Sequence, residues 1–110
     1  VSGERSKSGL APAAVPDVLA LAPRLRNVQI AGLMTIPPLA ADPETARPFF
    51  RKLRKLRGEW AAATGLDLAE LSMGMTHDLD VAVAEGATFV RVGTGIFGAR
   101  ARPAEGAEEA

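Results

Sequence analysis

Cysteine and tyrosine are absent from this sequence of 110 residues, and histidine occurs once, as His77. Without cysteine the chain can form neither a disulfide bond nor a thiolate metal site, and one histidine is too few for a histidine-based metal centre. Net charge is also missing, because 13 basic residues balance 13 acidic ones. No overall electrostatic field therefore attracts nucleic acid or a membrane surface. We expect no bound metal, no nucleic-acid partner and no membrane partner.

Long apolar runs are missing as well. None approaches the roughly 20 consecutive apolar residues that span a bilayer. The first residues, VSGERSKSG, lack the basic and apolar regions of a signal peptide. Hydrophobic residues make up 47% of the chain, as in soluble globular proteins, so we expect a cytoplasmic protein. Its first residue is valine rather than methionine, which indicates a piece of a longer protein.

What the sequence does contain is an alternation of helical and extended patterns. Helices are predicted within residues 12–25, over residues 43–64 and from Leu79 to Gly86, and strands over residues 27–36, 68–73 and 88–92. This order implies an α/β fold with parallel strands joined by right-handed crossovers. Three strands do not close a (β/α)₈ barrel, which needs about 250 residues. The residues alone leave a small open sheet and half of a barrel as alternatives.

Two parts of the chain are expected to differ in order. Residues 1–100 carry the alternating pattern and should form one folded unit. Residues 101–110 consist of Ala, Arg, Pro, Gly and Glu, a composition that cannot build a core. We therefore expect residues 101–110 to be a disordered tail.

The longest predicted helix, over residues 43–64, has an apolar stripe. Its members recur at the spacing of one helix face, which predicts that they pack on a core: Phe49, Leu53, Leu56 and Trp60. Pro48 would lie inside a helix that begins at Pro43, so a start nearer Arg47 is an alternative.

The same helix carries six cations: Arg47, Arg51, Lys52, Arg54, Lys55 and Arg57. They could form a nucleic-acid patch, which would bind oligonucleotides in a salt-dependent way. The polar face of a surface helix has the same composition, and the zero net charge favours that interpretation. The absence of aromatic residues for base stacking on this face points the same way.

Two glycine-bearing stretches, Gly74-Met75-Thr76 and Gly93-Thr94-Gly95, each follow a predicted strand. Glycine lets a backbone approach a ligand closely, and helix N-termini favour negative charge. Two such loops side by side could direct several N–H groups at one anion, and the phosphate site of a barrel is often built after its last two strands. The alternative is that both stretches are ordinary turns between strands and helices.

Arg91 lies between two valines in the last predicted strand. A buried arginine is costly without a partner, so it should face a ligand or an acid at the end of the strand. A structural salt bridge on the outer face is the alternative. His77 could act as a base and Lys7 could reach a phosphate, but both residue types are more often solvated in such positions. Asp78 is expected to cap a helix or pair with an arginine.

The stretch LSMGMTHDLDVAVAEGATFVRVGTGIFGAR, over residues 71–100, resembles the C-terminal signature of the pyridoxal phosphate homeostasis proteins, the YggS or PROSC family. GLMTIPP at residues 32–38 and SKSG at residues 6–9 are similar to two further motifs of that family, in the right order. The resemblance implies the C-terminal half of a (β/α)₈ TIM barrel of the alanine racemase N-terminal-domain type. It also implies a monomeric, non-catalytic parent that binds pyridoxal 5′-phosphate (PLP) and buffers it or delivers it to apoenzymes.

The resemblance assigns cofactor-binding roles residue by residue and no catalytic role. Thr76 lies where the family has a serine at the phosphate, and Ser72 and Gly74 belong to the same loop. Gly93 and Thr94 match the second phosphate loop. Arg91 matches the arginine that approaches the cofactor ring, where it would keep the pyridine nitrogen unprotonated and weaken the electron sink.

One part of the family site has no counterpart. The Schiff-base lysine of the family lies on an early strand, and none of the three lysines here, Lys7, Lys52 and Lys55, matches its motif. The chain is therefore expected to keep the phosphate-binding loops without the covalent anchor. The alternative is a PLP-dependent enzyme of the alanine racemase type. Such enzymes take a catalytic tyrosine from a second domain, and this sequence has none.

Overall fold

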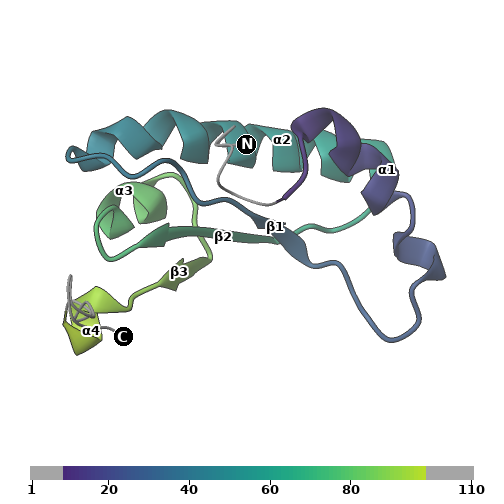
Figure 1. The fold of residues 1–110 in the computed structure, drawn as a ribbon. Coiled ribbons are helices and arrows are strands. Elements are labelled where there is room, and N and C mark those ends of the chain that lie inside the picture. Colours follow the sequence, from purple (N-terminus) through teal and green to yellow (C-terminus); the bar gives the residue numbers. More distant parts are fainter. Residues whose placement is uncertain (1–8, 99–110) are drawn as a thin grey trace.

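The computed structural model describes residues 9–98 and contains a sheet of three parallel strands (Figure 1). The strands are β1 (Gly32–Met34), β2 (Glu70–Met75) and β3 (Phe89–Arg91), adjacent in that order. Parallel pairing throughout confirms the predicted α/β arrangement. Residues 1–8, which include most of the SKSG motif and Lys7, and the expected tail at residues 101–110 lie outside the described residues.

The α-helices are α1 (Val15–Leu19), α2 (Arg47–Thr64), α3 (Leu79–Ala84) and α4 (Thr94–Phe97). Short 3₁₀ helices span Pro12–Ala14, Ala22–Arg24 and Pro43–Ala46. Figure 1 shows α1, α2 and α3 on one side of the sheet and α4 beyond the end of β3. Within residues 9–98, no helix has both the length and the hydropathy that a bilayer crossing requires.

The bounds of the elements differ in part from those predicted. The strand expected over residues 27–36 is limited to Gly32–Met34, because only this part pairs with β2. Helix α2 begins at Arg47 rather than Pro43, as the alternative start proposed. Pro48 then occupies the first turn, where its missing N–H breaks no helical hydrogen bond.

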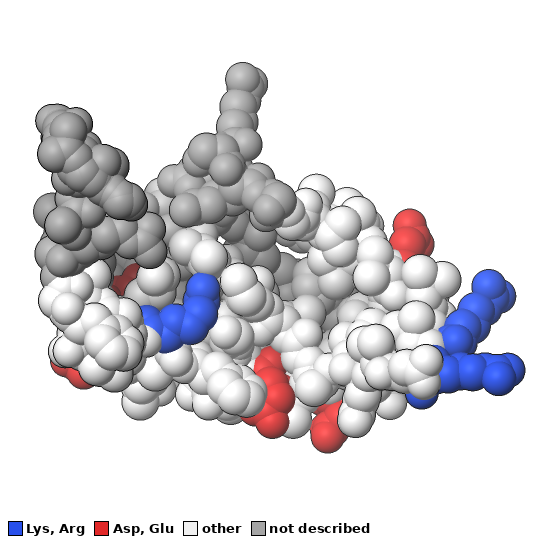
Figure 2. Space-filling model, turned by 60° about the horizontal axis from the view of Figure 1, so that its bottom comes forward, with Lys and Arg blue, Asp and Glu red and all other residues white. Residues whose placement is uncertain are grey.

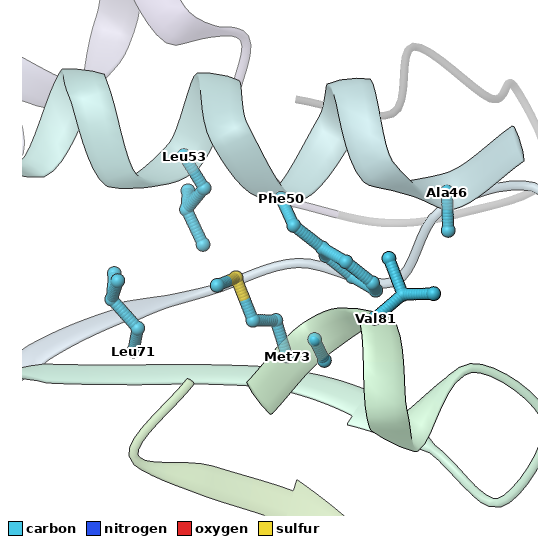
Figure 3. Close-up of a cluster of buried hydrophobic side chains, with 7 residues drawn as sticks. Ala46, Phe50, Leu53, Leu71, Met73 and Val81 are labelled. Atoms are coloured by element: carbon cyan, nitrogen blue, oxygen red, sulfur yellow. The ribbon is translucent and has the colours of Figure 1, made fainter. Parts of the chain in front are cut away.

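The main core lies between α2 and the sheet (Figure 3). Phe50, Leu53, Leu71 and Met73 are at most 2% exposed and pack together with Val81 of α3. The predicted stripe was therefore wrong at its first member, since Phe50 rather than its half-buried neighbour Phe49 enters the core. Phe49 and Phe50 both lie one turn before Leu53, so spacing alone does not distinguish them, and the packing of α2 on the sheet selects Phe50.

A second buried cluster joins the other end of α2 to α1. Trp60 packs with Leu19 and with Leu68, which is fully buried despite a positive φ of 44°. Trp60 and Leu53 confirm the rest of the predicted stripe as core, and Leu56 packs against this cluster partly buried. Together the two clusters hold both ends of α2 in place, and the first of them packs the helix on the sheet.

The face of the sheet away from α2 has no helix packed on it among the described residues (Figure 1). Side chains alternate along a strand, so Ser72 faces away from its core neighbours Leu71 and Met73. Met34, Ser72 and Phe89 lie in register across the sheet, and Met34 and Phe89 are 60% and 57% exposed. Figure 2, which brings the lower side of Figure 1 forward, shows mostly uncharged side chains outside the grey residues.

Candidate functional site

The candidate site lies at the carboxyl ends of the three strands. A cavity of about 220 Å³ opens there between the loop after β1 and the turn that joins β2 to α3. Ile36, Pro37 and Leu39 supply most of one wall, and Met75, His77 and Arg91 belong to the opposite part of the lining. The carboxylates of Asp42 and Asp78 also belong to the lining, so this mostly apolar cavity with a few polar groups suits a small organic molecule.

Gly74 belongs to β2 itself and not, as expected, to a loop. Four residues of β2, from Ser72 to Met75, lie opposite three of β3, from Phe89 to Arg91, so β2 has a bulge here. Gly74 has φ +102°, and a Cβ atom at this position would collide with the Cβ of Ala82 in α3. The glycine therefore allows α3 to pack closely on the end of β2.

The turn after β2 is closed by Asp78. Its Oδ1 accepts a 2.8 Å hydrogen bond from the Met75 N–H. Asp78 is the N-cap residue of α3, as expected, but its side chain makes no capping hydrogen bond to the helix and instead points back to the strand. Among the described residues it forms no salt bridge with an arginine. This contact fixes the position of Thr76 and exposed His77 between the strand and the helix.

Thr76 connects the two glycine-bearing stretches. Its Oγ1 accepts a 3.0 Å hydrogen bond from the N–H of Gly95, which lies 19 residues further along the chain. The structure thus brings the ends of β2 and β3 side by side, as the sequence predicted. Thr76 is half-buried, and its hydroxyl proton remains available to a ligand.

Gly93 and Thr94 do not form the loop that was expected. Gly93 is the N-cap of the single-turn helix α4, and its carbonyl accepts hydrogen bonds from Ile96 and Phe97 at 3.1 and 2.9 Å. The first N–H groups of any helix have no partner within the helix. Gly93 and Thr94 are both exposed, and they directly precede Gly95, whose N–H contacts Thr76.

Arg91 is half-buried at the end of β3. Its Nη2 donates a 3.2 Å hydrogen bond to the carbonyl oxygen of Thr35, and its buried Nε has no partner in the described part of the chain. No carboxylate within residues 9–98 forms a salt bridge with Arg91, contrary to the alternative that the sequence left open. A buried donor without a partner is rare in proteins and favours an acceptor supplied by a ligand.

Ser72 lies within β2 and not in the phosphate loop to which it was assigned. Its carbonyl oxygen accepts a 3.1 Å hydrogen bond from the Thr35 N–H, and its side chain faces the uncovered side of the sheet. The bulge at Gly74 separates Ser72 from Thr76, so the structure does not bring these two hydroxyls together through one loop.

The cations of α2 are engaged elsewhere. Glu85 is 3% exposed, and its carboxylate accepts from Arg47 at 2.6 Å and Arg51 at 3.0 Å, with Arg54 at 3.4 Å. The hydrogen bond from Arg47, followed by that from Arg51, holds the pKa of Glu85 below its usual range although burial raises it. This contact was missed, because a glutamate beside a helix-ending glycine looks solvated in the sequence.

The remaining cations of α2 follow the same pattern. Arg57 donates to the carbonyl oxygens of Leu68 and Ala69 at 3.3 and 3.1 Å, whereas Lys52 and Lys55 are exposed. Four of the six cations thus hold α2 on the rest of the described chain, which supports a structural role for this basic face. Within residues 9–98 no cluster of His, Asp or Glu could hold a metal ion.

Comparisons with known proteins point to one group. Residues 2–101 match the family model described as the alanine racemase N-terminal domain. The pyridoxal phosphate homeostasis protein of Aquifex aeolicus is 49% identical over 100 residues, which are 91% of this chain and 44% of that protein. The protein of the same name from Pseudomonas aeruginosa is 45% identical over 91% of this chain and 42% of its own length. The chain thus spans less than half the length of these curated relatives.

Solved structures lead to the same group. PipY of Synechococcus elongatus, solved without PLP, superimposes with a TM-score of 0.79 at 42% identity over 86% of this chain and 45% of PipY. PipY with PLP bound gives a TM-score of 0.77 over 84% of this chain and 44% of its own. Both matches cover less than half of the PipY chain.

Proposed function

Because the chain belongs to the family of the alanine racemase N-terminal domain, we propose that it forms the phosphate-binding part of a PLP-binding protein of cofactor homeostasis. Its relatives confirm the predicted resemblance to the pyridoxal phosphate homeostasis proteins and the predicted α/β fold, of which this chain supplies one part. PipY was solved with PLP bound, and we propose that this chain binds the same cofactor.

The observation that carries the proposal is the hydrogen bond between the Gly95 N–H and Thr76 Oγ1. It holds the turn after β2 against the turn after β3, so that hydroxyl and N–H donors from both can surround one phosphate group. Arg91 and the apolar cavity lie at the same ends of the strands. The cofactor has the matching chemistry, an anionic phosphate joined to a flat heteroaromatic ring.

The residues present fit this cofactor in part. Thr76 would donate its hydroxyl to the phosphate, and Gly93 and Thr94 would donate their N–H groups. Arg91 would direct its unpartnered Nε or Nη1 at an acceptor of the ring, a contact that keeps the ring nitrogen unprotonated. PLP, when bound, supplies a reactive aldehyde on an electron-withdrawing ring.

A lysine that could react with this aldehyde is not found among the described residues of the site. Lys52 and Lys55 are exposed on α2, on the far side of the core from the uncovered sheet face. Lys7 lies outside the described residues. We therefore propose that this chain binds the cofactor through its phosphate and ring, without a covalent bond to a lysine.

We further propose a non-catalytic role, in which the parent protein buffers PLP in the cytoplasm and delivers it to apoenzymes. An arginine at the ring suits storage, because it weakens the electron withdrawal that catalysis on PLP needs. The names of the relatives support homeostasis rather than turnover.

Titration calorimetry of the purified chain with PLP, pyridoxal and inorganic phosphate tests the proposal. We expect binding of PLP and of phosphate at one shared site, with competition between them, and much weaker binding of pyridoxal. Thr76→Val should weaken both phosphate-bearing ligands, whereas the exposed Gly58→Ala on α2 should bind as the unaltered chain does. Equal affinity for pyridoxal and PLP would contradict a phosphate site.

The missing covalent bond has its own test. Borohydride reduction of the mixture with PLP, followed by peptide mass mapping, should give no stoichiometric adduct at any single lysine. A full adduct at one defined lysine, Lys7 included, would show that the chain carries its own anchor and would refute that part of the proposal.

A further inference from the structure

We propose that Gly95 is a positioning residue, whose N–H and missing side chain together aim the Thr76 hydroxyl at a bound phosphate. This inference rests on the proposed function, since it concerns the same site. In the proposed function Gly95 makes no contact with the ligand. Its positioning role would explain why the turns after β2 and β3 must meet.

The contact with Gly95 determines where the hydroxyl proton of Thr76 can point. A threonine hydroxyl has one proton to donate and two lone pairs that accept. The Gly95 N–H lies 3.0 Å from Thr76 Oγ1 and occupies one lone pair. Because an N–H cannot accept, the hydroxyl proton must point away from Gly95, and it stays free to donate. The contact therefore turns Thr76 into a fixed donor, which is what an acceptor-only phosphate requires.

Gly95 has little room for a side chain. A Cβ atom at Gly95 would lie 2.8 Å from Thr76 Cγ2 and 3.2 Å from Thr76 Oγ1, and 3.0 Å from Val92 Cγ1. The 2.8 Å contact is shorter than a Cβ atom tolerates, so Thr76 or the turn around Gly95 would have to shift, and the other two contacts are tighter than most. Threonine has few χ1 positions, so the cheapest relief is a rotation of the Thr76 side chain to another rotamer. That rotation would move the hydroxyl away from the position in which Gly95 holds it.

Gly95 differs from the other glycines near the site in the reason why it is a glycine. Gly95 is not among the glycines with positive φ, so its backbone conformation does not call for glycine. Gly93 has no atom within 4 Å of a built Cβ. A side chain at Gly95 would therefore collide with the turn after β2, whereas one at Gly93 would not. Two of the three atoms that it would meet belong to Thr76.

The test compares three variants of the whole chain by titration with inorganic phosphate, followed by ¹H–¹⁵N spectra. Gly95→Ala should lose about tenfold or more in phosphate affinity, the loss expected for a misplaced hydrogen bond to a charged group. The double variant Gly95→Ala with Thr76→Ser should recover much of this loss, because serine lacks the Cγ2 atom nearest to the new methyl group. Gly58→Ala serves as the matched control, since a Cβ there meets no atom within 4 Å.

Amide hydrogen exchange at Gly95 provides a readout that needs no ligand. Its exchange should be slowed in the unaltered chain and should accelerate in Thr76→Val, which removes the acceptor. Exchange at the rate of a free amide in the unaltered chain would overturn the inference. So would Gly95→Ala binding phosphate within twofold of the unaltered chain, or a double variant no better than the single one.

The two proposals can fail separately. A slowed Gly95 amide in a chain that binds no phosphate would support the Thr76–Gly95 pairing and overturn the proposed function. Phosphate binding that survives Gly95→Ala would uphold the function and refute the positioning role. Only coupled loss and recovery across the variants supports both.

Discussion

Arg91 reaches across the central strand to Thr35. Its Nη2 donates a 3.2 Å hydrogen bond to the Thr35 carbonyl oxygen, although Arg91 ends β3, Thr35 follows β1, and β2 lies between these strands. The contact ties the two outer strands of the described sheet at their carboxyl ends. It also holds the guanidinium beside the cavity with its Nε unpartnered.

Replacement of Arg91 by methionine should therefore affect the ring of PLP more than its phosphate. We expect about tenfold weaker PLP binding, as for the loss of a hydrogen bond to a charged group, and nearly unchanged binding of inorganic phosphate. The free energy of unfolding should change by no more than about 1 kcal/mol, because one hydrogen bond and one unpaired buried donor disappear together. Calorimetric titration of both ligands and urea unfolding measure the three quantities. Equal losses for both ligands would place Arg91 at the phosphate; exposed Arg26→Met is the control.

Gly74→Ala should destabilise the chain. The new methyl group would collide with the Cβ of Ala82, and a residue with a side chain is strained at φ +102°. We expect a loss of about 2 kcal/mol or more in the free energy of unfolding, from overpacking and backbone strain together. Chemical unfolding measures it.

The double variant Gly74→Ala with Ala82→Gly separates the two causes of that loss. It removes the collision and keeps the strained φ, although glycine in α3 carries its own cost of up to about 1 kcal/mol. A double variant more stable than Gly74→Ala would assign the larger part to the collision. A Gly74→Ala variant as stable as the unaltered chain would contradict the packing of α3 on β2.

The core between α2 and the sheet makes a prediction that contrasts two phenylalanines. Phe50 is fully buried, whereas Phe97 is 85% exposed. Phe50→Ala should lower the free energy of unfolding by about 3–5 kcal/mol, because it removes buried apolar surface and leaves a cavity. Phe97→Ala should change it by less than about 0.5 kcal/mol. Similar losses for both variants, measured by thermal or urea unfolding, would mean that α2 does not pack as described.

The carboxylate of Glu85 predicts a pH dependence of stability. Its pKa in the folded chain is lowered, first by the hydrogen bond from Arg47, so ionised Glu85 stabilises the fold. A lowered pKa means that this stabilisation is complete above the ordinary value of 4.5 and is lost as pH falls through the folded-state pKa. The stability difference between the unaltered chain and Glu85→Gln should thus be constant near neutral pH and shrink in acid.

Urea unfolding at a series of pH values measures this difference. Glu44 also has a lowered pKa, because it accepts from Arg47, and its side chain is 58% exposed. Glu44→Gln is therefore the matched control and should show a smaller effect of the same sign, since solvent screens exposed pairs. A stability difference for Glu85→Gln that does not vary between neutral and acid pH would contradict the role assigned to the buried carboxylate.

The sequence predicted much of the fold, and its errors share one cause. Short apolar stretches located the three strands and a periodic apolar stripe located the long helix, because both patterns report which residues are buried. It placed Phe49 rather than Phe50 in the core, since both fit a stripe and only the sheet against α2 distinguishes them. It also assigned Gly74 to a loop, because a bulge depends on how many residues the neighbouring strand places opposite.

The candidate site divides in the same way. By itself the sequence determined that the two glycine-bearing stretches and Arg91 lie at the ends of neighbouring strands, because these are properties of local order along the chain. Only the tertiary structure decided that Gly95 contacts Thr76, that Arg91 reaches Thr35 and that Glu85 holds three arginines of α2. Such contacts join residues far apart in sequence, and their geometry depends on strand register and helix packing, which no local pattern records.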